Sequence, residues 1–235
     1  MQIKSRHTII TTVIAAIITL TVTSIAIAGS VPETGQQKCY DNTKEIVCPK
    51  PGEAFYGQDS TLITNPRSYT KLDSSGNSLP DSAGTWATVR DNVTGLTWEV
   101  KNSKDGTKDY DNPNDADNTY TWYDSSLVTS GDQGTASDKT DTEDFINALN
   151  SAQYGGYSDW RMPTVKELSM LVNRGETSPM IERFYFPNTF GYYYWSSSTY
   201  ASITIHAWSM YFILGHGHVS PKSNSFYVRA VREGQ

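Results

Sequence analysis

Two stretches in the second half of the chain repeat apolar residues at helical spacing. Residues 140–153 read "TDTEDFINALNSAQ", with apolar residues three and four positions apart along one face. Thr140 and Glu143 have the spacing of a capping box, which predicts that the first helix begins at this point. Its predicted buried face consists of Phe145, Ala148, Leu149 and Ala152.

The second helix is predicted in "PTVKELSMLVNRG", residues 163–175. Thr164 and Glu167 form another capping-box pattern, and Gly175 is suited to end the helix. Because two capping patterns precede two apolar stripes, the middle of the domain is expected to hold a pair of short helices. The predicted buried face of this one is Val165, Leu168, Leu171 and Val172.

Strand patterns lie on both sides of the two helices. Residues 85–101, "TWATVRDNVTGLTWEVK", predict a strand, an Asp-Asn turn and a second strand. Residues 192–200, 206–220 and 226–232 predict a C-terminal antiparallel sheet, with a turn over 215–217. Strands followed by helices and then by strands indicate an α+β fold. The predicted inward residues are Trp86, Val89, Leu96, Trp98 and Val100 in the first pair, and Trp208, Met210, Phe212 and Leu214 in the C-terminal sheet.

The chain divides into three segments by composition. Residues 1–28 resemble an export signal, with Lys4 and Arg6 ahead of an uncharged stretch and Ala26-Ile27-Ala28 as the cleavage site; an uncleaved anchor is the alternative. Residues 29–60 are rich in Pro and Gly and predict an irregular lead-in, and residues 61–235 form the main domain. No membrane span is expected after the signal is removed.

The two cysteines, Cys39 and Cys48, both lie in the lead-in. In an exported chain, two nearby cysteines favour a disulfide that closes a short loop. The formal net charge of −6 and the absence of a basic stripe argue against a nucleic-acid partner. The 15 Tyr and 6 Trp are typical of a loop-rich extracellular domain.

Five blocks occur in one order along the chain: "TGLTWEVK", "NTYTWYD", "GYSDWRMPTVKEL", "YWSSS" and "YVRAVR". Together they resemble the family once called domain of unknown function 1566, also known as the C-terminal domain of the Legionella collagen-like protein. The resemblance implies a C-type-lectin-like fold, with two helices packed on small twisted antiparallel sheets and much irregular loop. It also implies a bacterial, exported or surface-linked binding domain.

The block "GYSDWRMPTVKEL" has two interpretations. Arg161 beside Trp160 suits a clamp for a carboxylate, a sulfate or a sugar. Alternatively the block is structural, with Trp160 in the core and Asp159 paired with Arg161, Arg229 or Arg232. The capping pattern that follows directly favours the structural interpretation.

The polar segment 101–141 offers a possible calcium site. Calcium prefers several oxygen ligands, and alternating acidic residues supply them. An ordinary solvated loop is the alternative, because the spacing matches no EF-hand. The candidate ligands are Asp109, Asp111, Asp115 and Asp117.

The predicted recognition surface lies on the C-terminal sheet, where Tyr, His and Ser residues gather. Such side chains suit adaptable binding surfaces, and aromatic rings stack on sugars. The candidate ligand-binding residues are Tyr200, His206, Ser209, Tyr211, His216, His218 and Arg161. His216 and His218 also share a face if they lie in a strand, which would suit a metal ion, whereas in a turn they would be exposed and unpaired.

The sequence therefore predicts an exported, non-catalytic binding or adhesion module, located in the periplasm, at the cell surface or outside the cell. Its partner is expected to be a glycan or a cell-surface protein, with calcium as the one cofactor considered. Two alternatives stay open. One is a structural envelope protein without a ligand, and the other is a hydrolase that uses a carboxylate pair from Asp159, Glu167 and Glu182.

Overall fold

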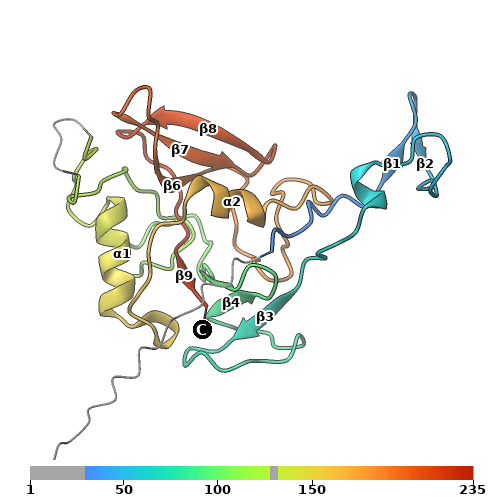
Figure 1. The fold of residues 1–235 in the computed structure, drawn as a ribbon. Coiled ribbons are helices and arrows are strands. Elements are labelled where there is room, and N and C mark those ends of the chain that lie inside the picture. Colours follow the sequence, from blue (N-terminus) through green and yellow to red (C-terminus); the bar gives the residue numbers. More distant parts are fainter. Residues whose placement is uncertain (1–29, 128–131, 235) are drawn as a thin grey trace, which may run out of the picture.

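The computed structural model describes residues 30–127 and 132–234. The predicted signal segment, residues 1–28, lies outside this range. The described chain forms two α-helices, α1 (Thr142–Ser151) and α2 (Val165–Leu171), and two 3-10 turns, η1 (Asp59–Thr61) and η2 (Tyr154–Gly156). Three small antiparallel sheets complete the structure (Figure 1). The α+β prediction, with two helices on small antiparallel sheets and long loops between them, is confirmed.

Two of the sheets build the main body. The four-stranded sheet has the order β3 (Tyr69–Leu72), β4 (Thr88–Asp91), β5 (Leu96–Glu99) and β9 (Val231–Glu233). The three-stranded sheet has the order β6 (Tyr193–Thr199), β7 (His206–Tyr211) and β8 (His216–Pro221). The turn predicted between β4 and β5 is present, and the Asp91 carboxylate fixes it by accepting hydrogen bonds from the backbone N–H groups of Val93 and Thr94.

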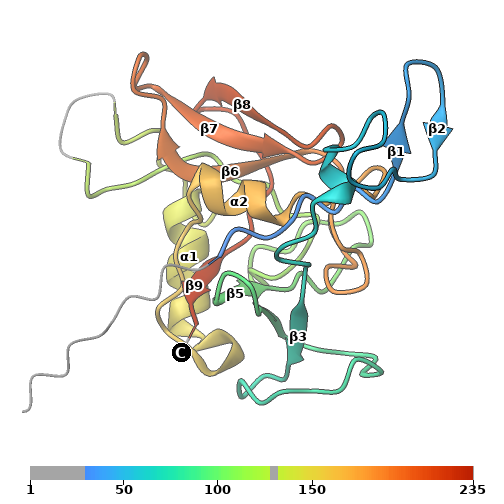
Figure 2. The same ribbon diagram turned by 45° about the vertical axis from the view of Figure 1, so that its right-hand side comes forward.

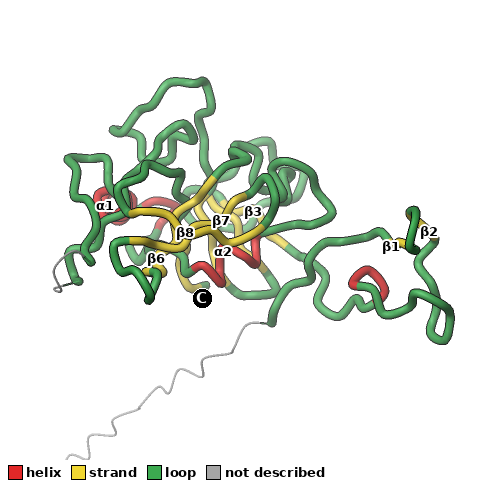
Figure 3. Tube along the Cα trace, turned by 90° about the horizontal axis from the view of Figure 1, so that it is seen from above, coloured by secondary structure: helices red, strands yellow, loops and turns green. Residues whose placement is uncertain are grey.

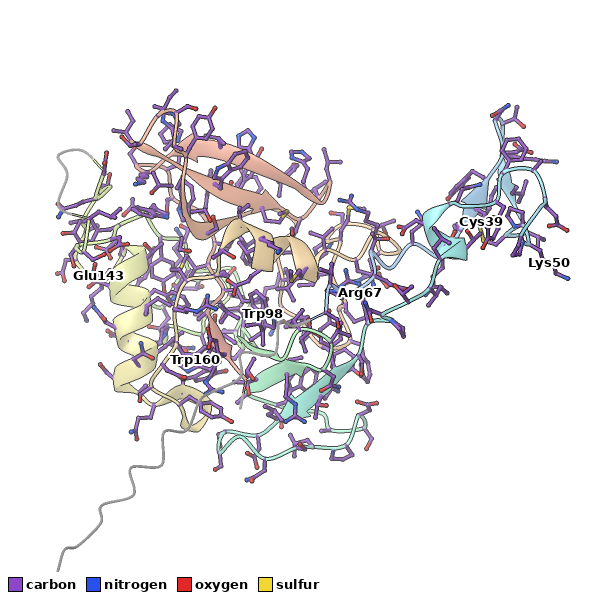
Figure 4. All side chains as sticks on the ribbon, in the orientation of Figure 1. Cys39, Lys50, Arg67, Trp98, Glu143 and Trp160 are labelled. Atoms are coloured by element: carbon purple, nitrogen blue, oxygen red, sulfur yellow. A yellow bond between two sulfur atoms is a disulfide. The ribbon has the colours of Figure 1, made fainter. Side chains whose placement is uncertain are left out.

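The N-terminal lead-in projects from this body as an arm (Figure 3). It contains a two-stranded sheet, β1 (Cys39–Tyr40) and β2 (Glu45–Ile46), and the predicted disulfide between Cys39 and Cys48 is present with a Cα–Cα distance of 5.0 Å. Arg67 lies at the root of the arm (Figure 4), where it donates to the Met170 carbonyl at the end of α2. The arm therefore joins the body beside α2.

Helix α2 lies between the two sheets (Figures 1 and 2), and the first hydrophobic cluster surrounds it. Leu168 and Leu171 of the helix are fully buried there, as the apolar pattern predicts. Trp98 from β5 and Met210 from β7 meet them from opposite sides. Burial of large apolar side chains supplies most of the stabilisation of such a small body, at roughly 25 cal/mol per Å².

The second hydrophobic cluster lies between α1 and the three-stranded sheet. Phe145 and Leu149 of α1 pack there with Trp160 and Trp195. The C-terminal segment runs between the two clusters, so Val228 and Ala230 face the second cluster and Val231 faces the first. Both faces of this segment are therefore buried.

The helix starts agree with the sequence in one case and differ in the other. At α2 the capping box is present: Thr164 Oγ1 accepts from the Glu167 N–H, and the Glu167 carboxylate accepts from the Thr164 N–H. At α1 the prediction of Thr140 was wrong, because the N-cap is Asp141, which accepts from Glu143 N and Asp144 N. The Glu143 side chain instead accepts hydrogen bonds from Ser125.

The end of α2 and the turn of the last hairpin also differ from prediction. The helix ends at Leu171 instead of Gly175, because Val172 pairs in a β-bridge with Ile181. The hairpin turns over residues 212–215, and β8 already begins at His216. Leu214 lies at this turn with 59% of its surface exposed, so its assignment to the core was wrong.

The "GYSDWR" block forms the corner between α1 and α2. Trp160 is buried, and its indole N–H donates to the Tyr154 carbonyl. The Asp159 carboxylate accepts two hydrogen bonds from Arg232, at 2.6 and 3.1 Å. Of the three partners that the sequence allowed for Asp159, the structure selects Arg232, and the block is structural at this residue.

Several basic side chains lie inside the protein. Lys101 forms a buried ion pair with Glu99 at 2.8 Å, and Arg229 donates to the Glu99 carbonyl and to Thr189 Oγ1. The Nζ atom of Lys71 lies 3.7 Å from the Trp86 ring centroid and donates to two backbone carbonyls. Each buried cation is thus matched by carbonyls, rings or a carboxylate, as burial requires. The set is Lys71, Lys101, Lys222, Arg229 and Arg232.

Candidate functional site

The structure brings only some of the predicted ligand-binding residues together. Tyr211, His216 and His218 meet on one face of the three-stranded sheet, where they join three aromatic residues that were not among the predicted site residues. We call this surface the aromatic face. Its members are Tyr192, Tyr193, Tyr211, His216, His218 and Phe226.

Strand pairing places these residues side by side. Tyr193 of β6 lies opposite Tyr211 of β7, and Tyr211 lies opposite His216 of β8. His218 is two residues further along β8, so its side chain projects from the same face as that of His216. The two histidines therefore lie in a strand and share a face, which is one of the two alternatives that the sequence left open.

The rings of the aromatic face stack on one another. The Tyr193 and Tyr211 centroids are 4.4 Å apart with an interplanar angle of 22°, and Tyr193 and His218 are 4.9 Å apart. Beneath them Phe226 stacks on Tyr193 at 4.9 Å and on Trp195 at 4.5 Å. Because Phe226 and Trp195 belong to the second core cluster, the surface rings are held in place by the interior.

The outer members of the face are accessible to a ligand. Tyr192 has 46% of its surface exposed, His216 and His218 are exposed, and Tyr193 and Tyr211 are half-buried. Partial burial, together with the neighbouring hydroxyls of Tyr211 and Tyr192, raises the pKa of Tyr193. The Tyr193 phenol therefore stays a neutral hydrogen-bond donor and acceptor at physiological pH. The surface combines ring faces with hydroxyl and imidazole groups.

Ser209, Tyr200 and His206 do not contribute to the exposed surface of the aromatic face. Ser209 is fully buried and donates to the His218 carbonyl, so the expectation of a surface residue was wrong. Tyr200 packs on Trp208 at 5.6 Å. His206 and Trp208 project from the face of β7 opposite to Tyr211, because strand residues alternate. Ser209 is on the same side of the sheet as Tyr211, as alternation predicts, but packing covers it.

Arg161 and the three candidate hydrolase carboxylates are each bound to other groups. Arg161 forms a two-pronged contact with Glu167, with nitrogen–oxygen distances of 2.7 and 2.9 Å. Burial opposes ionisation of Glu167, but the bonds from Arg161 and Thr164 lower the pKa of this carboxyl overall. Asp159 is paired with Arg232, and Glu182 accepts from Asn173. These carboxylates stabilise the fold locally.

The four candidate calcium ligands do not converge. Asp109 and Asp111 are exposed, and Asp111 pairs with Lys139 at 2.8 Å. Asp117 is buried, and its carboxylate accepts from the N–H groups of residues 105 and 106, while Asp115 accepts from the Asp117 N–H. Within residues 30–127 and 132–234, no group of three or more His, Cys, Asp or Glu side chains is placed to hold a metal ion. The four acidic residues serve mainly as turn-forming acceptors.

The fold and the aromatic face define a small α+β domain with a preorganised aromatic surface. None of the helices in the described part of the chain has the length and apolar character needed to cross a membrane. The family model of the Lcl C-terminal domain matches residues 87–232, and the chain belongs to this family. No curated protein matches the chain.

Sequence reasoning missed Tyr193 and Phe226 as site residues. The signal for Tyr193 was present, since "YYYWSSS" places one tyrosine opposite Tyr211 once the hairpin register is known. Phe226 gave no such signal, because it reaches the face from a loop that follows β8.

Proposed function

We propose that this protein is an exported, non-catalytic binding module that recognises an uncharged glycan through the aromatic face. The observation that supports this proposal best is the ring stack that runs from Trp195 through Phe226 and Tyr193 to Tyr211. Rings fixed in this way offer flat apolar surfaces to the C–H faces of sugars at little cost in side-chain entropy. Neighbouring hydroxyl and imidazole groups supply hydrogen bonds to sugar hydroxyls.

The net charge and the distribution of basic residues in the chain favour an uncharged ligand over a sulfated one. The whole chain has a net charge of −6, and two of its basic residues, Lys4 and Arg6, lie outside the described part. A sulfated polymer needs clustered Arg or Lys side chains, and five such side chains are buried in the core. Export is supported by the signal-like N-terminus, the Cys39–Cys48 disulfide and membership of the Lcl C-terminal domain family.

A glycan array probed with the purified exported chain tests this function. The array carries neutral and sulfated glycans and is run with calcium and with a chelator. Binding to neutral glycans that Tyr211→Ala abolishes and Tyr200→Ala retains is the expected result, because Tyr200 packs outside the aromatic face. Binding to sulfated glycans alone would contradict the proposal. Absence of any glycan binding would favour a protein partner or a structural role.

A further inference from the structure

A pocket of about 260 Å³ lies beside α1, and none of its lining residues belongs to the aromatic face. It forms where the first turns of α1 meet the loop that contains Tyr110 and Tyr120. One part of its lining is apolar and consists of three rings, Tyr110, Tyr120 and Phe145. The other part is charged and consists of Asp111, Lys139 and Asp144.

The three rings form a fixed wall. The Tyr120 centroid lies 5.5 Å from Tyr110 and 5.3 Å from Phe145. The Tyr110 hydroxyl donates to the Thr119 carbonyl at 2.9 Å, which holds this ring in position. Tyr120 and Phe145 are themselves part of the second core cluster, so the wall is preorganised. A rigid aromatic wall of this kind suits an alkyl chain or a cation.

The charged part of the pocket has an excess of negative charge. Asp111 and Lys139 form an exposed ion pair at 2.8 Å. Among the residues that the structure describes, Asp144 forms no ion pair. Burial and the neighbouring carboxylates of Asp141, Asp138 and Glu143 raise the pKa of Asp144. A cation placed beside Asp144 would relieve this repulsion.

We propose that this pocket binds the ammonium group of a small organic cation, with the aromatic wall against its alkyl part and Asp144 as its counter-charge. Carboxylates and ring faces both attract a cation and both disfavour an anion. The acidic balance of the whole chain also favours a cation over an anion as a ligand. The pocket shares no lining residue with the aromatic face, so this assignment does not depend on the proposed glycan binding.

The position of Lys139 supports the assignment. This residue places the chain's own ammonium group at the rim, 2.8 Å from Asp111. Its backbone has a φ of 60°, a conformation that favours glycine. Because Lys139 occupies one of the two pocket carboxylates, a bound ammonium group would compete with it for Asp111.

Titration calorimetry of the intact chain with n-butylammonium chloride tests the assignment, with uncharged n-butanol as the matched probe at constant ionic strength. Butylammonium is expected to bind at least about tenfold more tightly than butanol. Asp144→Asn should weaken butylammonium binding by about tenfold or more, as loss of a charge-assisted contact does. The control is Glu53→Gln, which removes the same charge from an exposed position in the N-terminal arm, outside the pocket lining, and should change affinity by less than about twofold.

Lys139→Gly provides a second test that does not depend on Asp144. It removes the competing ammonium group and places glycine at a positive φ, so the variant should fold and bind butylammonium more tightly than the wild type. Equal affinity for butanol and butylammonium would overturn the assignment. So would unchanged butylammonium binding in folded Asp144→Asn, or weaker binding in Lys139→Gly.

Discussion

Arg232, near the C-terminus, closes the corner that begins at Asp159, 73 residues earlier in the chain. Its guanidinium donates through Nε and Nη2 to the two oxygens of that carboxylate and lies 3.7 Å from the centroid of the Tyr157 ring. Arg232 is buried, whereas the Asp159 side chain is 58% exposed. This ion pair therefore joins the last strand to the segment between the two helices, beside the backbone bridge between Arg161 and Val231.

This pair makes stability depend on pH in a predictable direction. The hydrogen bonds from Arg232 hold the pKa of Asp159 below its ordinary value of 3.8. A lowered carboxyl pKa stabilises the fold above pH 3.8, and this contribution is lost as the pH falls through the folded-state value. Asp159→Asn should therefore lower stability at pH 7 by about 0.5–1 kcal/mol, a small effect because the carboxylate is exposed, and should reduce the loss of stability below pH 3.8. Urea unfolding at several pH values measures both effects, and Asp138→Asn should change neither.

Removal of Lys101 should be much more damaging. Lys101→Met leaves the fully buried Glu99 without its ionic partner, and an uncompensated buried charge costs about 3–5 kcal/mol. Chemical denaturation measures the loss. Lys108→Met is the matched control, since Lys108 is exposed and donates a hydrogen bond to the Thr119 hydroxyl. Equal stability of the two variants would show that the buried pair contributes little.

The N-cap of α1 gives a third prediction. The Asp141 carboxylate accepts hydrogen bonds from the N–H groups of Glu143, Asp144 and Ser137. Asp141→Ala should lower the free energy of unfolding by about 1–2 kcal/mol, because three backbone donors lose their acceptor. Thr140→Ala serves as the comparison: a larger effect there would restore Thr140 as the cap.

The disulfide of the arm gives a fourth prediction. Purified protein, unfolded without reductant, should show no thiol that reacts with an aromatic disulfide reagent, because Cys39 and Cys48 are bonded to each other. A double Cys→Ser variant should lose about 2–3 kcal/mol locally, from chain entropy in the arm. We therefore expect faster proteolysis within residues 39–48 and little change in the unfolding temperature of the body. Two titratable thiols in the wild type would contradict the pairing.

The aromatic face gives a fifth prediction. Tyr211→Ala should remain folded and lose about 1 kcal/mol, because the ring is half-buried and stacks on Tyr193. Tyr193→Ala should lose more, since it contacts Tyr211, His218 and Phe226. Thermal unfolding of the two variants compares them. A larger loss for Tyr211→Ala would place Tyr211 in the core instead of on the recognition surface.

Patterns of neighbouring residues predicted the helices and strands well, but they predicted the tertiary contacts of these elements poorly. The capping box at Thr164 and Glu167 and the turn after Asp91 depend on residues close in sequence, so both could be predicted. The cap at Asp141 was missed by one residue, because Thr140 and Asp141 both suit a helix start. The partner of Asp159 was narrowed to three arginines, and only the tertiary structure selects Arg232.

The aromatic face was predicted only in part, because the sequence does not show which side chains of β7 are covered by packing. Tyr211, His216 and His218 were expected on one surface and do lie together, since strand alternation places them there. Ser209 lies opposite His218 on the same side of the sheet, but it is fully buried. No sequence pattern indicated the pocket beside α1, because Tyr110 lies in a loop and Asp144 in a helix. The two residues are 34 positions apart in the sequence.

The buried lysines should differ from the exposed lysines in their reactivity toward reagents that modify amines. Acylating reagents require a free, accessible amine, whereas the Nζ atoms of Lys71, Lys101 and Lys222 are held by backbone carbonyls and lie over aromatic rings. Peptide mass spectrometry after mild acetylation should therefore find these three unmodified, while exposed amines such as Lys108 react readily. Acetylation of any of these three lysines would show that the part of the protein around it had opened. Amine acetylation therefore measures local unfolding at individual residues.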